Sequence, residues 1–338
     1  MRKDPIHKFK KVLSASNQIA IITHWSPDGD AMGSSLGLYH YLKKKGKNCR
    51  VIVPNDYPSF LFWLPGNKSV LNFQLQAQKV AAYLEKADLI FTLDFNTYSR
   101  IEELGKLVAK STAKKILIDH HRQPENFADF YFHDIEASST AELIFEFISG
   151  LDSKDFISKN IATCLYTGIM TDTGNFRFPS TQAKTHRTVA FLMECGAVNH
   201  KIYNAIFDEN TENRLKLLGF CLSEKMQIVS DLHTAIISLS EHEHDKFYYQ
   251  KGDTEGVVNY PLSVRGIHLS VFLAERDGLI KISFRSKGNF DVNLFARKYF
   301  SGGGHKNAAG GKSDLSLNET IKNLLNILSK YKANLQIA

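Results

Sequence analysis

Three short stretches of this chain end a hydrophobic run with acids and histidines: residues 23–30, 92–94 and 118–121. The apolar residues that precede each stretch are typical of buried parallel strands. We therefore expect His24, Asp94 and His120 at the carboxyl ends of strands, the edge of an open α/β sheet at which ligands bind. Several carboxylates at one edge repel one another unless cations lie between them. The pattern predicts a metal site and favours an enzyme.

The candidate ligands combine carboxylates with imidazoles and include no cysteine. Asp28 and Asp30 flank a glycine that we interpret as a sharp turn of the backbone. Asp172 is expected at the carboxyl end of a helix, where the helix dipole disfavours a lone acid unless a cation offsets the cost. This set suits Mn²⁺ or a related ion better than structural zinc. It suffices for two ions, and paired ions clamp the attacking and leaving oxygens of a phosphoryl transfer.

Each of these residues has a plainer interpretation when it is taken alone. Asp28 and Asp119 could be turn or cap residues, and His120 could be a histidine packed in the core. Ser139 and Glu142 form the pattern of a capping box, which by itself explains why a helix begins there. The pattern points to a metal centre because the acids and histidines occur together at predicted strand ends.

A glycine-rich segment at residues 302–311 is the second candidate site. Consecutive glycines let backbone N–H groups converge on an anion, and the apolar residues and helices around them favour packed structure over a flexible linker. Arg285 ends a predicted strand, where its guanidinium could hold a phosphate through two hydrogen bonds. Arg265 is a further candidate, although a solvated surface arginine explains it equally well. The predicted phosphate-binding loop includes Gly303, Gly304 and His305.

Strands and helices alternate in the first half of the chain. Strands are predicted at 18–23, 49–53, 88–93 and 115–118, and helices at 30–45, 76–86, 99–110, 141–148, 156–170 and 181–195. This rhythm predicts an α/β fold with a parallel, doubly wound sheet. The predicted organisation is a catalytic domain at 1–195, a helical connector at 196–228 and a smaller mixed α/β domain at 229–338.

In the last third of the chain, strands are predicted at 232–239, 268–275 and 279–285, and helices at 292–300 and 317–332. Asp277 and Gly278 form a strong signal for a tight hairpin between two of these strands. The acidic, histidine-rich segment 241–245 is interpreted as a solvated loop rather than a metal site.

The bulk composition is that of an ordinary globular protein of 338 residues, with 43% hydrophobic residues and a formal charge of +7. The positive charge favours phosphate-bearing partners. We expect no membrane association and a cytoplasmic location, because no apolar stretch is long enough to span a bilayer and the first residues lack a signal-peptide core. The four widely spaced cysteines are expected to be reduced thiols. A homodimer is compatible with the chain, but no pattern predicts one.

On these residues the chain resembles the DHH phosphoesterases, which are named after the triplet 119–121. The resemblance covers most of residues 15–190 and includes His-x-x-Pro-Asp-x-Asp at 24–30 and Thr-Asp-Thr-Gly at 171–174. It implies one metal ion held by His24, Asp28 and Asp94, and a second held by Asp30, Asp94, His120 and Asp172. Asp94 would then bridge the two ions. The resemblance also implies that Asp119 orients a histidine and that His121 lies near the scissile phosphate.

The last third of the chain resembles the DHHA1 domain, the substrate-binding partner of the catalytic domain in one DHH subfamily. This resemblance implies that Arg285 and His305 hold a substrate phosphate. The combination is similar to enzymes that release mononucleotides from very short RNAs and convert adenosine 3′,5′-bisphosphate to AMP. The implied cofactor is two Mn²⁺ ions that activate water, with Mg²⁺ or Co²⁺ as substitutes. The implied partners are short oligoribonucleotides and nucleoside bisphosphates.

Other functions of the same fold stay open. The nearest is a phosphodiesterase that acts on cyclic dinucleotides or on linear products such as pApA. Pyrophosphatases share the metal motifs, but the glycine-rich segment speaks against them. A nucleotide-binding protein without catalysis would be expected to lose ligands, whereas every predicted ligand position here carries a suitable residue.

Overall fold

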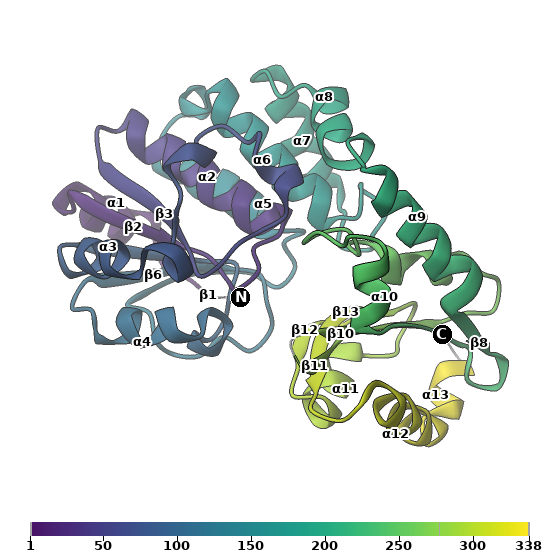
Figure 1. The fold of residues 1–338 in the computed structure, drawn as a ribbon. Coiled ribbons are helices and arrows are strands. Elements are labelled where there is room, and N and C mark those ends of the chain that lie inside the picture. The colour runs from purple at the N-terminus through teal and green to yellow at the C-terminus, as the bar shows by residue number, and fades with distance from the viewer. Residues whose placement is uncertain (1, 277, 337–338) are drawn as a thin grey trace. The chain divides into compact units, whose positions relative to one another are not determined.

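The chain folds into two compact units, which comprise residues 1–209 and 210–338 (Figure 1). The computed structural model describes residues 2–276 and 278–336. Each unit contains a sheet of its own. The division between the units lies inside the segment 196–228, for which the sequence predicts a helical connector, and the predicted division into three parts stays a prediction.

The first unit is built on a seven-stranded sheet in which every pair except β1–β7 is parallel. In spatial order its strands are β1 (Arg2–Lys3), β7 (Phe130–His133), β6 (Lys114–Asp119), β5 (Leu89–Leu93), β2 (Gln18–Ile22), β3 (Asn48–Val53) and β4 (Leu71–Asn72). The chain places β3 and β4 on one side of β2, and β5, β6 and β7 on the other. The winding therefore reverses between β2 and β5, the point at which ligands bind in such sheets. The predicted doubly wound α/β fold is confirmed.

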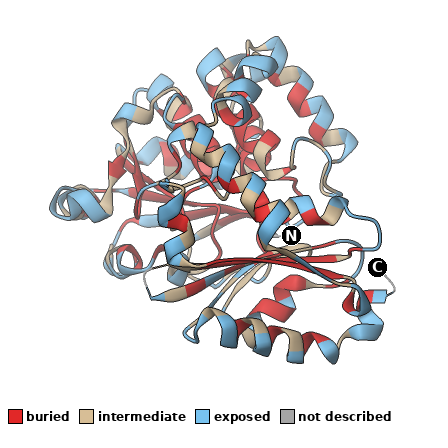
Figure 2. Cartoon of the chain, turned by 45° about the vertical axis from the view of Figure 1, so that its right-hand side comes forward, coloured by how far each residue is buried: buried red, intermediate tan, exposed pale blue. Residues whose placement is uncertain are grey.

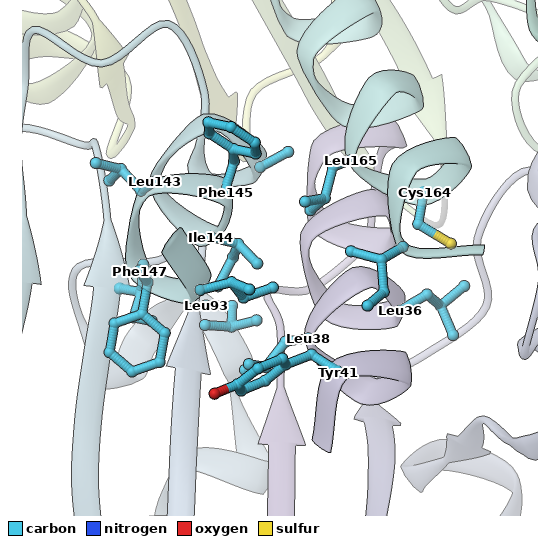
Figure 3. Packing of buried hydrophobic residues seen from close by; sticks show 14 of the residues in the cluster. Leu36, Leu38, Tyr41, Leu93, Leu143, Ile144, Phe145, Phe147, Cys164 and Leu165 are labelled. Atoms are coloured by element: carbon cyan, nitrogen blue, oxygen red, sulfur yellow. The ribbon is translucent and has the colours of Figure 1, made fainter. Parts of the chain in front are cut away.

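Helices cover both faces of this sheet, because alternate residues of each strand point to opposite sides. Ile19 and Ile21 join the apolar cluster beneath α2 (Gly29–Lys44), α5 (Thr140–Leu151) and α6 (Lys159–Asp172). Ala20 and Ile22 join the cluster beneath α3 (Phe73–Glu85) and α4 (Glu103–Lys110). Figure 2 shows the strands as buried, and Figure 3 shows side chains of α2, α5 and α6 meeting in the first cluster. The remaining longer helices of this unit are α1 (Ile6–Ala15) and α7 (Ala183–Glu194).

Helices α2 and α6 pack backbone against backbone along a row of glycines on α2. A Cβ atom on Gly33 would lie 2.5 Å from the carbonyl oxygen of Cys164, and a Cβ atom on Gly29 would overlap the side chain of Thr171. Gly29 is the first residue of α2 and not part of a sharp turn. The predicted turn at Gly29 is therefore wrong, and the missing side chain makes room for α6. This close packing brings the carboxyl end of α6 to the amino end of α2.

Replacing Gly33 with alanine is expected to lower the free energy of unfolding by about 1–3 kcal/mol, because the new methyl group meets backbone atoms that can move only with the whole helix. Gly219, on the exposed side of α9 (Glu212–Phe220), has no atom within 4 Å of its Cβ position. The Gly219→Ala change should instead be neutral or slightly stabilising. Chemical denaturation of both variants measures the difference, and equal stability would contradict the packing argument.

The second unit contains a six-stranded mixed sheet. In spatial order its strands are β12 (Gly303–His305), β13 (Ala308–Ser313), β11 (Leu279–Ser286), β10 (Leu269–Arg276), β9 (Thr234–Leu239) and β8 (Met226–Val229). Helices α11 (Val292–Tyr299), α12 (Leu317–Ser329) and α13 (Lys332–Gln336) contribute to its main apolar cluster. The predicted hairpin forms, since Arg276 pairs with Leu279. Asp277, which is part of the hairpin signal, lies outside the described residues.

Two segments of this unit are more regular than the sequence predicts. The glycine-rich segment predicted as a loop contains β12 and β13, which pair as a hairpin. The acidic segment predicted as a loop forms α10 (Glu241–Lys246), whose capping box joins Ser240 and Glu243. The loop predictions rested on the glycine content of the first segment and the polarity of the second, and neither property prevented regular backbone hydrogen bonding. Within the part of the chain that the structure describes, the helices are too short or too polar to cross a membrane.

Candidate metal centre and phosphate-binding residues

The predicted metal ligands lie together at the point where the winding of the first sheet reverses. His24 follows β2, Asp94 follows β5, and His120 follows β6, whose last residue is Asp119. Asp28 is the N-cap of α2, Asp30 lies in its first turn, and Asp172 ends α6. Among the described residues of this unit, three groups of side chains have ligand atoms within 4.8 Å of one another: His24, Asp28 and Asp94; Asp30, His120 and Asp172; and Asp94, Asp119 and His121.

Both central imidazoles are held with Nε2 toward the carboxylates. Nδ1 of His24 is 2.9 Å from the carbonyl oxygen of Trp25, and Nδ1 of His120 is 3.2 Å from that of Ala137. Because a carbonyl oxygen only accepts, Nδ1 is the donor in each ring. In a neutral ring the Nε2 lone pair then faces carboxylate oxygens, which is unfavourable unless a proton or a metal ion lies between them.

Asp94 lies between the two histidines. Its Oδ2 is 3.4 Å from Nε2 of His24, and its Oδ1 is 3.5 Å from Nε2 of His120. Its backbone has a φ of 64°, a left-handed conformation that aspartate tolerates better than most residues. The two oxygens thus point into different ligand groups, as a bridging carboxylate would require.

Asp28 and Asp30 are fixed by the ends of two helices. Oδ1 of Asp28 accepts hydrogen bonds of 3.0 Å from the N–H groups of Asp30 and Ala31, which leaves Oδ2 to face His24 at 3.8 Å. Asp30 accepts from the N–H groups of Thr140 (2.6 Å) and Ala141 (2.8 Å) at the start of α5. The amino end of α5 therefore stabilises the buried carboxylate of Asp30.

Thr140 is a residue of the site that the sequence did not reveal. It is fully buried, and its hydroxyl donates a 2.9 Å hydrogen bond to Oδ1 of Asp94. The capping-box interpretation was only partly right. The hydroxyl of Ser139 accepts from the N–H of Glu142, but the carboxylate of Glu142 accepts from the N–H of Ser138 and not from that of Ser139. The same helix start thus contacts two predicted ligands, Asp30 and Asp94.

Asp119 is paired with His121, at 2.8 Å between Oδ1 and Nδ1. Burial alone would raise the pKa of Asp119, but the charge and hydrogen bond of His121 hold it below its usual value. Since Nδ1 is engaged with Asp119, Nε2 is the ring nitrogen of His121 that could reach a phosphoryl oxygen. This geometry agrees with the implied orienting role of Asp119, which stays a prediction.

The electrostatics of the centre favour a bound cation. Burial, together with the charges of Asp94 and Asp172, raises the pKa of Asp30 well above its usual value, although two N–H donors oppose the shift. Burial alone would lower the pKa of His120, but its hydrogen bond to Asp94 and the charge of Asp172 raise it well above the usual value. Burial raises the pKa of Asp172 to about 6. Asp30, His120 and Asp172 thus retain protons to higher pH than usual, because the buried carboxylates repel one another. Bound metal ions would take the place of these protons.

The affinity of the metal-free protein for Mn²⁺ is therefore expected to rise as the pH increases through about 6 and beyond. His120 has a raised pKa and must lose a proton, and Asp172 must be ionised, before either binds a metal ion. Each proton that the metal displaces makes the affinity about tenfold higher per pH unit. Calorimetric titration in buffers of different ionisation enthalpy counts these protons. An affinity that does not change over this range would contradict the assignment of these two ligands.

Arg285 and His305 project from the same face of the second sheet. Arg285 lies directly opposite Ala308 on β13, and His305 lies opposite the same alanine from the other side. Directly opposite residues of antiparallel strands point to one face, so the two side chains flank the small Ala308 from strands roughly 10 Å apart. Two of the predicted phosphate-binding residues therefore share one face of this sheet, with the small side chain of Ala308 between them.

The glycines serve the hairpin more directly than the sequence suggested. A Cβ atom on Gly304 would overlap the carbonyl oxygen of Ala308, so β12 and β13 pair closely only with glycine there. The N–H of Gly304 donates to Oδ1 of the buried Asn293 at 3.0 Å and is not directed at a ligand. Asn293 also accepts from Nε of Arg297, an exposed cation beside Gly303 that the sequence analysis did not select. Arg265 is exposed and lies in the turn after η8 (Val257–Ser263), not on the strands that carry Arg285 and His305.

Comparison with known proteins identifies the family. Residues 18–169 match the N-terminal domain of the DHH family, and residues 231–334 match the DHHA1 domain. The chain is 31% identical over 312 residues to the bifunctional oligoribonuclease and PAP phosphatase NrnA of Thermus thermophilus, an alignment that covers 91% of this chain and 88% of that protein. The chain belongs to the DHH phosphoesterase family. It is therefore a hydrolase that acts on phosphate esters.

Other members of the DHH phosphoesterase family are similar over most of this chain. The protein of the same name from Bacillus subtilis is 29% identical over 302 residues, covering 89% of this chain and 90% of that one. The cyclic-di-AMP phosphodiesterase PdeA of Listeria monocytogenes is 26% identical over 95% of this chain and 49% of its own length. The crystal structure of an exopolyphosphatase-related protein from Bacteroides fragilis is 42% identical with a TM-score of 0.93, covering 98% of this chain and 97% of that one.

Proposed function

We propose that this DHH phosphoesterase releases mononucleotides from very short oligoribonucleotides and converts adenosine 3′,5′-bisphosphate to AMP. The observation that carries the proposal is a pair of adjoining ligand groups, the group of Asp94 and the group of His120, which meet where Oδ1 of Asp94 is 3.5 Å from Nε2 of His120. Two adjoining cation sites suit phosphoryl transfer. The choice of substrate is supported by the two relatives named as oligoribonuclease and PAP phosphatase, at 29% and 31% identity.

The residues present fit two divalent ions, and we propose Mn²⁺ with Mg²⁺ or Co²⁺ as substitutes. His24, Asp28 and Asp94 would hold one ion, and Asp30, His120 and Asp172, with Asp94, the other. When bound, such ions activate water and offset the negative charge that builds up on phosphoryl oxygens. Carboxylate and imidazole ligands without thiolate support this group of metals.

The chain's own side chains would orient the substrate. Asp119 fixes the ring of His121 through Nδ1, so that Nε2 can donate a hydrogen bond to an oxygen of the scissile phosphate. Arg285 and His305 would hold the second phosphate of the substrate, and Gly303 and Gly304, which lack side chains, would let it approach the backbone closely. Arg265 is a further candidate for this contact.

We also propose that the enzyme works in the cytoplasm. Cys49, Cys164 and Cys221 are buried, Cys195 is partly buried, and all four are free thiols. Free thiols persist in reducing compartments, which supports this location.

The test is hydrolysis of four substrates side by side with Mn²⁺: pApA, adenosine 3′,5′-bisphosphate, cyclic di-AMP and inorganic tripolyphosphate. Turnover of the first two is expected to exceed that of the others. Arg285→Ala should raise KM for the bisphosphate more than it lowers kcat, because its charge holds the phosphate that does not react. Preferential turnover of cyclic di-AMP or tripolyphosphate would replace the proposed substrate and leave the metal centre in place.

A further inference from the structure

A pocket of about 530 Å³ lies in the first unit, away from the metal centre. Its wall carries four cations from four separate elements: Lys43 of α2, Arg50 of β3, Lys68 of η2 (Asn67–Ser69) and Lys79 of α3. Among the described residues that line it none is acidic, and none of the four cations takes part in an ion pair with a described residue. The three lysines are exposed and Arg50 is half-buried, and a bound anion would offset the repulsion among these positive charges.

The pocket exists because the sheet is incomplete at this edge. Strand β4 is only two residues long and pairs with Ile52 and Val53. No described strand pairs with the outer edge of residues 48–51, where the side chain of Arg50 lies half-buried. Among the described residues, the guanidinium of Arg50 donates only to the neighbouring carbonyl of Cys49, at 3.0 Å. Arg50 therefore lines the pocket at an edge of β3 that no described strand covers.

Two further features favour a bound ligand at this place. Gln76 adds a side-chain amide to the wall, at a kink in α3 where φ is −134° and ψ is 38°. Ser69 and Tyr39 add a hydroxyl and a half-buried aromatic ring to the same wall. The volume lies within the range of about 300–1,000 Å³ that small-molecule sites occupy.

The pocket is distinct from the metal centre. Asp28 of that centre caps the amino end of α2, and Lys43 lies near the carboxyl end, roughly 22 Å away at about 1.5 Å per residue. Lys43 of the pocket therefore lies at the opposite end of α2 from the metal ligands. This inference therefore does not rest on the proposed substrate.

We propose that this pocket is a second binding site for an oligophosphate chain of two or more phosphates, either free or carried by a nucleotide. Lysine ammonium groups and one guanidinium supply the charge-assisted donors that phosphate oxygens accept. The four cations converge on one hollow and do not form a track across the surface, which favours a compact ligand over an extended nucleic acid.

The test is a calorimetric titration of the full chain in EDTA with ATP and, separately, with inorganic tripolyphosphate. EDTA removes metal-dependent binding at the catalytic centre. The Lys68→Ala/Lys79→Ala variant should bind both ligands about tenfold or more weakly than the unaltered protein. The control Lys10→Ala/Lys11→Ala removes the same charge from α1 and should bind normally, as should Arg285→Ala. Tighter binding of ATP than of tripolyphosphate would identify a nucleotide as the carrier, and equal binding would identify the free chain.

Several results would overturn the site. The first is no binding of ATP or tripolyphosphate at millimolar concentration. The second is an equal loss of affinity in the pocket variant and in the α1 control, and the third is a loss of affinity in Arg285→Ala alone. Tighter pocket-dependent binding of a single-stranded RNA of twelve nucleotides would also overturn the choice of a compact ligand. Circular dichroism and thermal unfolding check that each variant is folded, and Lys68→Gln replaces the double variant if that one unfolds.

Discussion

Replacing Asp94 with asparagine is expected to lower kcat about a thousandfold or more while the protein stays folded. Asp94 is the residue that faces both His24 and His120, at 3.4 and 3.5 Å. A neutral amide weakens both ligand groups at once and turns an NH₂ group toward one of them. Loss of about 4 kcal/mol of charge stabilisation corresponds to this change in rate. Asparagine keeps the size of the side chain and tolerates the left-handed backbone found here.

The measurement is turnover of pApA together with the affinity and stoichiometry of Mn²⁺ binding. Asp231→Asn, whose side chain is 88% exposed, removes the same charge elsewhere and should be silent. Asp30→Ala is a poorer test, because Asp30 also accepts two N–H groups at the start of α5 and its loss would leave them unsatisfied. Normal turnover by a folded Asp94→Asn protein would rule out a metal centre bridged by this residue.

The sequence predicted the sheet that positions the site because the signals involved are local. A buried strand such as β5 has a mostly apolar sequence, and Asp94 follows it directly, so both the strand and the acid at its end could be predicted from the same few residues. The two-residue strands β1 and β4 have no such signal, since two residues show no periodicity. The hairpin of β12 and β13 was hidden for another reason. Its glycines make room for carbonyl oxygens of the partner strand, whereas in sequence they resemble a loop.

The sequence predicted that the metal ligands gather at one sheet edge, but other contacts between distant parts of the chain were beyond sequence reasoning. The backbone of Thr140 meets Asp30 across 110 residues and its hydroxyl meets Asp94 across 46. In sequence, the segment around Thr140 resembles the family pattern of a helix start near the site, but a capping box is enough to explain it, so the contacts of Thr140 were not predicted. The glycines of α2 are similar, because only the packing of α6 against them shows why Gly29 and Gly33 lack side chains. Residue types could be predicted locally, but their partners depend on the fold.

Replacing Thr140 with valine is expected to weaken Mn²⁺ binding about 10–100-fold and to lower kcat, with little change in stability. Valine has the shape of threonine but lacks the hydroxyl that donates to Oδ1 of Asp94 at 2.9 Å. Partners that orient a ligand typically contribute this much to metal affinity. The backbone contacts of α5 with Asp30 remain, so the effect isolates the orientation of Asp94.

Two further variants separate this role from simple packing. Thr140→Ser restores the hydroxyl and should recover most of the affinity. Thr167→Val makes the same change at another buried threonine, whose hydroxyl bonds only within α6, to the carbonyl of Thr163 at 2.9 Å. If both valine variants bind Mn²⁺ equally well, Thr140 merely fills space. If only Thr140→Val loses affinity, and serine recovers it, then the start of α5 sets the geometry of the carboxylate on which both ligand groups depend.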